Sequence, residues 1–456
     1  MNALFVICGI GVFALIAEIF NLKKWVTIIS FVGLLAAIAV SIRDWSMISY
    51  YYNGMMHFDR FSIAFTTLVL VIAAFWFWMS GNYFENEAHR TDKIALLFFI
   101  LAGAIMMIGF NNLVILFLGI EILSISLYVL AGSNKESLSS TEASFKYFLM
   151  GSFATGFLLF GIALVYGATG SFSVPVIADF ISNHRSLPRY LYVGVLMMMV
   201  GLGFKISAVP FHSWAPDVYE GSPTSVTALM STVVKIAAFS AFVKIFSVCF
   251  ARFSVSLLYF EQALVVLTLV IANVTAVYQT SVKRMLAYSS VGQVGYLLLA
   301  FSSDAANSSG IIFYYLTGYA LASLLAFTVV QIIETEKRNA SIESFKGLFK
   351  NNPLLAISLT LALLSLSGIP PLAGFFAKYL VFTLSVSKGF IVLTCVAVIT
   401  SLIGVYYYFK PIVAMYQSEE SESQRISISL SQKVLLAVLI LLNLLVGIFP
   451  DLFRLV

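Results

Sequence analysis

The sequence predicts an all-α polytopic membrane protein with about 14 transmembrane helices. Of the 456 residues, 61% are hydrophobic and 10% are charged, and the apolar residues form long continuous runs. Soluble domains carry roughly 25% charged residues, and a soluble fold could not cover this much apolar surface. A membrane β-barrel is also excluded, because it would show alternating segments of about ten residues.

Fourteen apolar runs are long enough to cross the bilayer, since a membrane helix needs about 20 mostly apolar residues. They cover residues 2–21, 25–42, 61–80, 94–110, 112–131, 145–167, 189–211, 225–248, 255–278, 284–302, 310–333, 354–384, 389–409 and 434–453. An even number of spans places both termini on the same side of the membrane.

The lysines and arginines between these runs are unevenly distributed. One set of alternate connections holds fourteen of them, and the other set, with the C-terminal tail, holds seven. Because basic loops face the cytoplasm, we expect both termini on the non-cytoplasmic side. The net charge of +5 is too small and too dispersed to indicate nucleic acid binding.

Five lysines and one mid-span acid stand out inside the apolar runs, whereas the acids Glu18 and Glu261 lie close to the ends of theirs. The lysines are Lys146, Lys205, Lys235, Lys244 and Lys378, and the mid-span acid is Glu121. Lys146 opens its run and Lys244 lies near the end of its run, so both side chains can extend to the interface. Each of the others costs roughly 2.5–3.5 kcal/mol at the bilayer centre. One acid and three lysines at this depth indicate a functional site.

Polar residues accompany these charges at helical spacing. Glu121 is followed by Ser124 and Tyr128 at i+3 and i+7, and Ser231 and Thr232 share a face with Lys235. Such stripes could hold water beside the charge. Alternatively, the hydroxyl groups bond back to their own helix, as is common in membranes.

Prolines interrupt two of the runs. Pro210 lies after Lys205, and Pro370 and Pro371 lie before Lys378. Proline removes a backbone donor, and a broken helix at membrane depth is tolerated only where protein or water satisfies the freed groups. Paired interruptions in two halves indicate a transport pathway, with packing kinks as the alternative.

The cysteines and glycines of the sequence do not form a recognisable metal, disulfide or dinucleotide site. Cys8, Cys249 and Cys395 each stand alone in an apolar run, which argues against iron–sulfur, zinc or disulfide sites. The string from Gly9 to Ala14 resembles a dinucleotide motif but lies inside a membrane helix without a preceding strand. We expect no cofactor on this chain.

Three segments resemble the antiporter-like membrane subunits of respiratory complex I. They are GFKISAVPFHSWAPDVYEGSPTSVTALMSTVVK (203–235), KRMLAYSSVGQVGYLLLA (283–300) and SLSGIPPLAGFFAKYLVF (365–382). The resemblance is closest to subunit N of NADH-quinone oxidoreductase and its equivalents in mitochondria and plastids, and it covers nearly the whole chain.

This resemblance implies a row of proton-carrying residues. Glu121 would pair with Lys205, Lys235 would be the central lysine and Lys378 the terminal one. His212 would lie near the cytoplasmic input, and Lys146 matches a further family lysine. Ser231 and Thr232 would support Lys235.

One position departs from the family pattern. Gln293 stands where many relatives have histidine. A glutamine can relay a hydrogen bond but cannot titrate, so a proton-holding role at this position is in doubt.

The resemblance also implies two inverted five-helix repeats, with spans 7 and 12 broken. We predict N-terminal helices 1–3 in residues 1–93, the first antiporter-like repeat in 94–248, the second in 255–413, and a C-terminal helix in 430–456. A weak internal similarity, Ser207-Ala-Val-Pro210 against Ser367-Gly-Ile-Pro370, agrees with two repeats.

The functional hypothesis is a proton-translocating subunit of complex I in the bacterial inner (plasma) membrane. NADH, FMN, iron–sulfur clusters and quinone would be held by partner subunits, and K- and M-like subunits would be its membrane neighbours. A subunit of a multi-chain sodium/proton antiporter and an ion-coupled solute carrier are the alternatives. A carrier would need more polar groups near the breaks than Ser207, His212 and Ser213 supply.

Overall fold

The computed structural model describes residues 2–20, 22–84, 89–184, 186–417 and 425–453. The chain forms two compact units. Unit 1 comprises the described residues up to Ile206 together with Val233–Leu257, and unit 2 comprises Ser207–Thr232 and the described residues from Leu258 onward. The predicted repeat boundaries stay a prediction, and parts of the predicted regions 1–93 and 430–456 lie outside the described residues.

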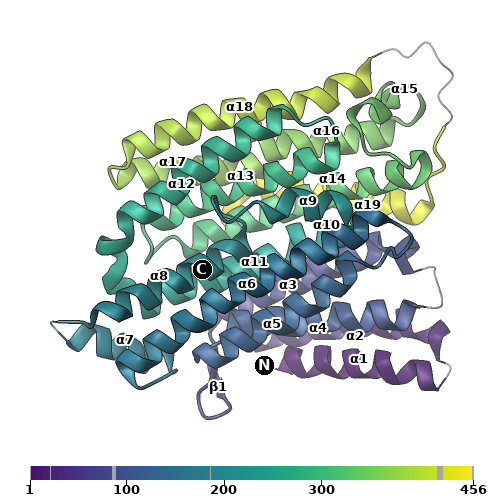
Figure 1. Ribbon diagram of the computed structural model, residues 1–456. Coiled ribbons are helices and arrows are strands. Elements are labelled where there is room, and N and C mark those ends of the chain that lie inside the picture. Colours follow the sequence, from purple (N-terminus) through teal and green to yellow (C-terminus); the bar gives the residue numbers. More distant parts are fainter. Residues whose placement is uncertain (1, 21, 85–88, 185, 418–424, 454–456) are drawn as a thin grey trace. The chain divides into compact units, whose positions relative to one another are not determined.

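Unit 1 contains long helices and one β-hairpin in its described part (Figure 1). Its main elements are α1 (Asn2–Ile19), α2 (Lys23–Arg43), η1 (Asp44–Ser46), β1 (Ser49–Tyr51), β2 (Met56–Phe58), α3 (Arg60–Met79), α4 (Arg90–Gly109), α5 (Leu113–Ala131), α6 (Leu138–Thr169), α7 (Val174–Asn183), α8 (Arg189–Ile206) and α11 (Val233–Lys244), which continues into a π-helical turn (Ile245–Cys249). This short hairpin is an exception to the predicted all-α fold.

Unit 2 is helical in its described part. Its main elements are α9 (Trp214–Gly221), α10 (Thr224–Ser231), α12 (Ser254–Val277, which begins in unit 1), α13 (Val282–Ser303), α14 (Ser309–Lys337), α15 (Leu348–Asn351), α16 (Pro353–Ser367), α17 (Ala373–Ser387), α18 (Ile391–Tyr416) and α19 (Leu430–Ile448). Within this unit α14 packs against α16, α17 and α19.

Short polar side chains define where several helices begin. Asp59, Asn112, Ser137 and Ser281 each accept a hydrogen bond from a backbone N–H in the first turn of the following helix. Ser429 forms a capping box at the start of α19. These side chains replace the partners that the first N–H groups of a helix lack.

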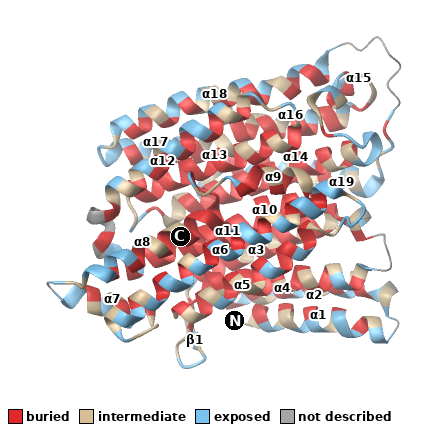
Figure 2. Ribbon diagram, in the orientation of Figure 1, coloured by how far each residue is buried: buried red, intermediate tan, exposed pale blue. Residues whose placement is uncertain are grey.

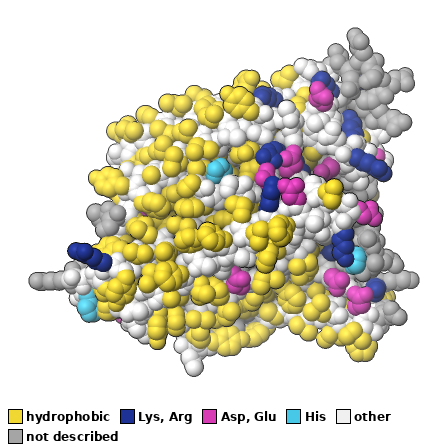
Figure 3. All heavy atoms as spheres, viewed as in Figure 1, with side chains coloured by type: hydrophobic (Ala, Val, Ile, Leu, Met, Phe, Trp, Pro, Cys, Tyr) yellow, Lys and Arg dark blue, Asp and Glu magenta, His cyan; other side chains and the backbone are white. Residues whose placement is uncertain are grey.

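Thirteen helices in the described part are long and apolar enough to cross a membrane. Side chains such as Phe153 and Phe160 are exposed along α6, where Figure 3 shows a broad hydrophobic surface. By contrast, every residue of α11 is buried, and α11 is red in Figure 2. The chain is therefore a polytopic membrane protein with an interior that contains whole helices.

The predicted break in span 12, residues 354–384, is confirmed. This run forms two helices of 15 residues each, α16 and α17, because the segment around Pro370 and Pro371 cannot continue a helix. Together the two helices cover the length of one span.

Other helices also differ from their predicted ranges. The helix predicted at 145–167 begins at Leu138, because the Ser137 cap allows a polar turn to extend it. The helix predicted at 189–211 ends at Ile206, before Pro210. The run 225–248 is divided into α10 and α11 at Thr232, whose φ of −112° and ψ of −81° are not helical.

Close helix packing in unit 1 positions α5 against α4. A Cβ atom at Gly103 would lie 2.6 Å from the carbonyl oxygen of Gly119, and one at Gly119 would lie 2.9 Å from that of Gly103. Small residues let membrane helices approach in this way. The helix that bears Glu121 therefore packs closely against α4.

The β-hairpin ties three connections of unit 1 together. Met56 forms an isolated bridge with Phe110, and Asn112 forms another with Ser173. The side chain of Asn111 also donates to the carbonyl of Gly54 at 2.8 Å. One end of unit 1 is thus cross-linked by backbone hydrogen bonds.

Lysines from neighbouring helices bind carbonyl groups at helix C-terminal ends. Lys378 donates to Ser367 at the end of α16 (2.9 Å), and Lys244 donates to Ile108 near the end of α4 (3.3 Å). Lys283 donates to Ser222, which caps α9, and Lys410 donates to Val277 at the end of α12. The last carbonyls of a helix have no partner within it and form the negative end of its dipole, so an ammonium group is favourable there.

Gly368 allows the break between α16 and α17. Its φ is +89°, and a Cβ atom there would lie 2.9 Å from Cδ of Lys378. Both the backbone conformation and the space next to the lysine require glycine.

We expect Gly368→Ala to destabilise the protein by about 1–3 kcal/mol, because a residue other than glycine is strained at this φ. The melting temperature of the purified protein or complex would measure this effect. Gly156→Ala is the control, because Gly156 lies within α6 with nothing within 4 Å of its Cβ position. Equal melting temperatures for the two variants would contradict the expectation.

Candidate functional site

In unit 1, Lys205 reaches the polar face of α5. It lies in the last turn of α8 and is buried, and its Nζ donates to Oγ of Ser124 at 2.5 Å. The same Nζ lies 5.8 Å from the ring centre of Tyr128. Lys205 therefore contacts Ser124 and Tyr128, two of the three residues that the helical spacing places on one face of α5. The third residue is Glu121.

Glu121 is not in direct contact with Lys205. Its Oε1 atom is buried and has no hydrogen-bond partner in the described part of the protein. The two charges are near enough to interact electrostatically. The predicted pair is thus separated, with Ser124 holding the ammonium group one helical turn from the carboxylate.

Lys235 lies in the first turn of α11, three residues after the irregular Thr232. Its side chain is buried, with 2% of the residue exposed. The hydroxyl groups of Ser231 and Thr232 both donate to the carbonyl of Ala228, at 3.0 and 2.7 Å. These two residues bond back to α10, as the alternative interpretation of the stripe expects.

In unit 2, Lys378 is held by two oxygens and an aromatic ring. Its Nζ donates to the Ser367 carbonyl and to Oγ of Ser401, both at 2.9 Å. It also lies 4.8 Å from the ring centre of Tyr296. Pro370 and Pro371 stand between the carbonyl and the lysine in sequence, so the break folds the chain back to form this contact.

Gln293 of α13 is the centre of a buried hydrogen-bond network. Its Oε1 accepts from the hydroxyl of Tyr315, and its Nε2 donates to the hydroxyl of Tyr408 and to the carbonyl of Leu366, both at 3.2 Å. Tyr408 also shares a hydrogen bond with Ser289. The network fixes which end of the amide is the donor.

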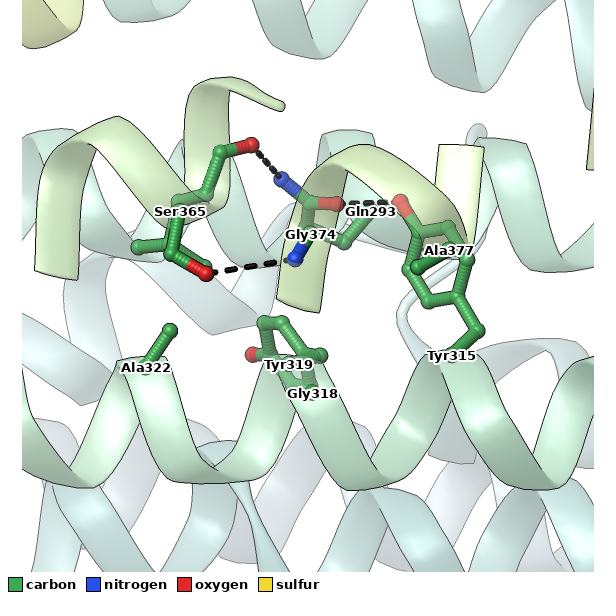
Figure 4. Close-up of a pocket in the computed structure, with 9 residues that line it drawn as sticks. Gln293, Tyr315, Gly318, Tyr319, Ala322, Ser365, Gly374 and Ala377 are labelled. Atoms are coloured by element: carbon green, nitrogen blue, oxygen red, sulfur yellow. Dashed lines mark hydrogen bonds between the residues drawn. The ribbon is translucent and has the colours of Figure 1, made fainter. Parts of the chain in front are cut away.

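A small cavity lies beside this network (Figure 4). Its volume is about 10 Å³, and Gln293, Tyr315, Tyr319, Ser365 and Ala377 contribute to its lining. This is roughly the space that one water molecule needs. The cavity connects the network to the residue adjacent to Lys378.

The two remaining predicted residues lie in different surroundings. His212 is in the break between α8 and α9, and its buried Nδ1 has no hydrogen-bond partner in the described residues. Lys146 lies on α6, half-exposed, and forms an ion pair with Glu142 at 2.6 Å.

Comparison with known proteins gives the family. The family described as NADH:quinone oxidoreductase/Mrp antiporter, TM, matches residues 110–404. NADH-quinone oxidoreductase subunit N of Cytophaga hutchinsonii is 43% identical over 455 residues, covering 99% of this chain and 98% of that protein. The chain belongs to the NADH-quinone oxidoreductase subunit N family. The family predicted from the three motifs is confirmed.

Two solved structures share the fold of this chain. A chain of respiratory complex I from Thermus thermophilus with bound aureothin has a TM-score of 0.84 and 29% identity, with 99% of this chain and 98% of that chain covered. A chain of the Mrp complex from Dietzia sp. DQ12-45-1b has a TM-score of 0.89 and 20% identity, with 99% and 95% covered, and shows a shared fold.

Several partners of these residues were not predicted from the sequence. Ser367 and Ser401 bind Lys378, and Tyr315 and Tyr408 bind Gln293. Tyrosines inside apolar runs are the sequence signal for such partners. The direction in which their side chains point depends on how the helices pack, which the sequence does not show. Among the described residues, no group of three or more His, Cys, Asp or Glu side chains could hold a metal ion.

We expect Tyr315→Phe to destabilise the protein by about 1–3 kcal/mol, because it leaves the buried Oε1 of Gln293 without a donor. A lower melting temperature of the purified protein or complex would show the effect. Tyr379→Phe on α17 is the matched control, because 53% of Tyr379 is exposed. If both variants melt together, the hydrogen bond contributes little.

Proposed function

We propose that the chain is a proton-translocating membrane subunit of NADH:quinone oxidoreductase. Membership of the subunit N family supports this proposal, and the observation that carries it is the set of buried lysines at helix breaks. Lys205 and Lys378 each lie beside a break, and Lys235 follows the irregular turn between α10 and α11. A membrane protein retains such costly groups where they move or sense charge.

In unit 1, the proton-moving element would be the separated pair of Glu121 and Lys205. The ammonium group has a hydroxyl partner in Ser124 and a carboxylate one turn away. Approach to Glu121 would favour the charged forms of both groups, and withdrawal would favour release of the lysine proton. A small displacement of Lys205 along α5 would therefore change the charge that Lys235 experiences.

In unit 2, Lys378 would hold the proton before its release. Two neutral oxygens and the Tyr296 ring stabilise its ammonium form without neutralising its charge. Gln293 would act as a relay within a network of hydroxyl groups, because an amide cannot titrate. The water-sized cavity near Tyr319 and Ala377 offers space for a bridging water.

Energy for this movement would come from other subunits. Electrons would pass through NADH, FMN, iron–sulfur clusters and quinone in partner chains of the complex, and the drive would reach this chain through protein contacts. K- and M-like membrane subunits are the proposed neighbours. The chain would lie in the bacterial inner membrane with both termini on the non-cytoplasmic side, following the distribution of basic loops.

An antiporter subunit is the second candidate, because the matching family includes Mrp antiporters and the fold matches a chain of an Mrp complex. Purification of the native assembly separates the two. We expect flavin, iron–sulfur clusters and NADH-dependent quinone reduction to copurify with the chain. A flavin-free assembly that exchanges sodium for protons would support the antiporter.

We expect Lys235→Met to abolish proton pumping by the assembled complex in membrane vesicles, because methionine preserves the packing and cannot hold a proton. Pumping can be followed with a pH-sensitive dye during NADH oxidation. Lys433→Met is the control, because Lys433 is an exposed residue of α19. Normal proton-to-electron stoichiometry in the Lys235 variant would refute the assignment.

A further inference from the structure

A second group of titratable residues lies in unit 1 at the C-terminal end of α11. Lys244 is the last residue of this helix and is buried, with 8% of the residue exposed. Its Nζ donates to the carbonyl of Ile108 at 3.3 Å and to Oγ of Ser62 at 3.4 Å, and lies 5.2 Å from the ring centre of Phe110. All three contacts are neutral, and both hydrogen bonds are long.

An acid and a histidine approach this lysine from the hairpin. Asp59 follows β2 and caps α3, where its Oδ1 accepts from the backbone N–H of Ser62 at 2.8 Å. His57 lies within β2, and its buried Nε2 has no hydrogen-bond partner in the described residues. The ring of His57 stacks on Tyr50 with centres 4.4 Å apart, and Tyr50 is 62% exposed. Lys244 is buried, whereas Asp59 and His57 are half-buried.

The charges of the three groups are coupled. Burial raises the pKa of Asp59, but the hydrogen bond from Ser62 and the positive charge of Lys244 outweigh it and leave this pKa below its usual value. Burial lowers the pKa of His57, the charge of Asp59 raises it, and the charge of Lys244 lowers it. Loss of the lysine proton would therefore increase the proton affinity of both neighbours.

Other ionisable groups on the surrounding elements are at the surface or already bonded. Arg60 of α3, Asp179 of α7 and His184 after α7 are exposed. Asp44 of η1, which packs against α3, accepts from the side chain of Asn2 at 3.0 Å. Within the described part of this end, Asp59 is the acid that interacts electrostatically with Lys244.

We propose that Lys244, Asp59 and His57 form a second proton-release site, in addition to Lys378 of unit 2, through which protons leave unit 1 at its hairpin end. The proposal rests on the proposed function. Lys244 gives its proton to the carboxylate of Asp59 through a bridging water molecule, which leaves a neutral amine and a neutral acid. Asp59 passes the proton to the free Nε2 of His57, and the resulting imidazolium releases it to bulk water. Each transfer moves one proton and restores the preceding group.

Lys244 also caps the C-terminal end of α4, so a purely structural role must be tested separately. Lys244→Arg retains the positive charge and the hydrogen-bond donors but removes a group that can lose its proton. We expect this variant to assemble and reduce quinone while it pumps fewer protons per NADH. Wild-type pumping by Lys244→Arg, with pumping lost only in Lys244→Met, would show that the lysine is a cap and would overturn the proposal.

His57 gives the site a characteristic pH dependence. In proteoliposomes with the pH of each side set independently, wild-type pumping should decline only once the pH on the hairpin side falls below the ordinary histidine pKa, because burial lowers the pKa of His57 and protonated His57 cannot accept a further proton. His57→Gln should lose this decline and pump more slowly at neutral pH. His184→Gln is the control, because His184 is an exposed histidine of the same unit. An unchanged pH profile in His57→Gln would overturn the proposal.

Asp59→Asn completes the test and separates it from the test of the proposed function. It should reduce pumping as His57→Gln does, since an amide cannot accept the lysine proton. If Lys235→Met abolishes pumping while the Asp59 and His57 variants pump normally, the release site is wrong and the proposed function stands. If Lys235→Met pumps normally, the proposed function itself is wrong.

Discussion

An ammonium group bound to the free carbonyls at a helix end is the interaction on which much of this structure depends. A helix that ends within the membrane-spanning region leaves carbonyl groups that lipid cannot satisfy, and a buried lysine needs oxygen atoms that lipid cannot supply. The contact of Lys378 with Ser367 at the end of α16 meets both needs at once. A similar contact recurs between Lys244 and the carbonyl of Ile108 near the end of α4.

This interaction also determines how mobile each lysine can be. Neutral oxygens hold an ammonium group without cancelling its charge, whereas a carboxylate in direct contact would neutralise the pair. Lys205 is bonded to Ser124, while Glu121 lies nearby without a partner of its own at its buried Oε1 in the described part of the chain. A lysine held in this way can exchange partners at modest cost, which suits a group that must change its protonation state.

The sequence predicts those features that depend on local chemistry. Hydropathy locates the spans, and proline locates the breaks near Pro210 and Pro370 because it lacks a backbone donor. The division at Thr232 has no such signal, since neither glycine nor proline lies there. The contact of Tyr315 with Gln293 joins two helices, and its existence depends on helix rotation, which an almost uniformly apolar sequence does not reveal. His57 and Asp59 appear in the sequence as ordinary loop residues, because the fold alone brings them to Lys244.

The hairpin bridges make one end of unit 1 stiffer than the other. Because Met56 is joined to Phe110 and Asn112 to Ser173, the adjoining ends of α3, α4, α5 and α7 are linked through the backbone. A displacement at the opposite ends of these helices will therefore tilt them about this cross-linked end, which itself moves little. Motion is then largest near the far ends and smallest at the hairpin, so work delivered by a neighbouring subunit is most effective when applied far from the bridges.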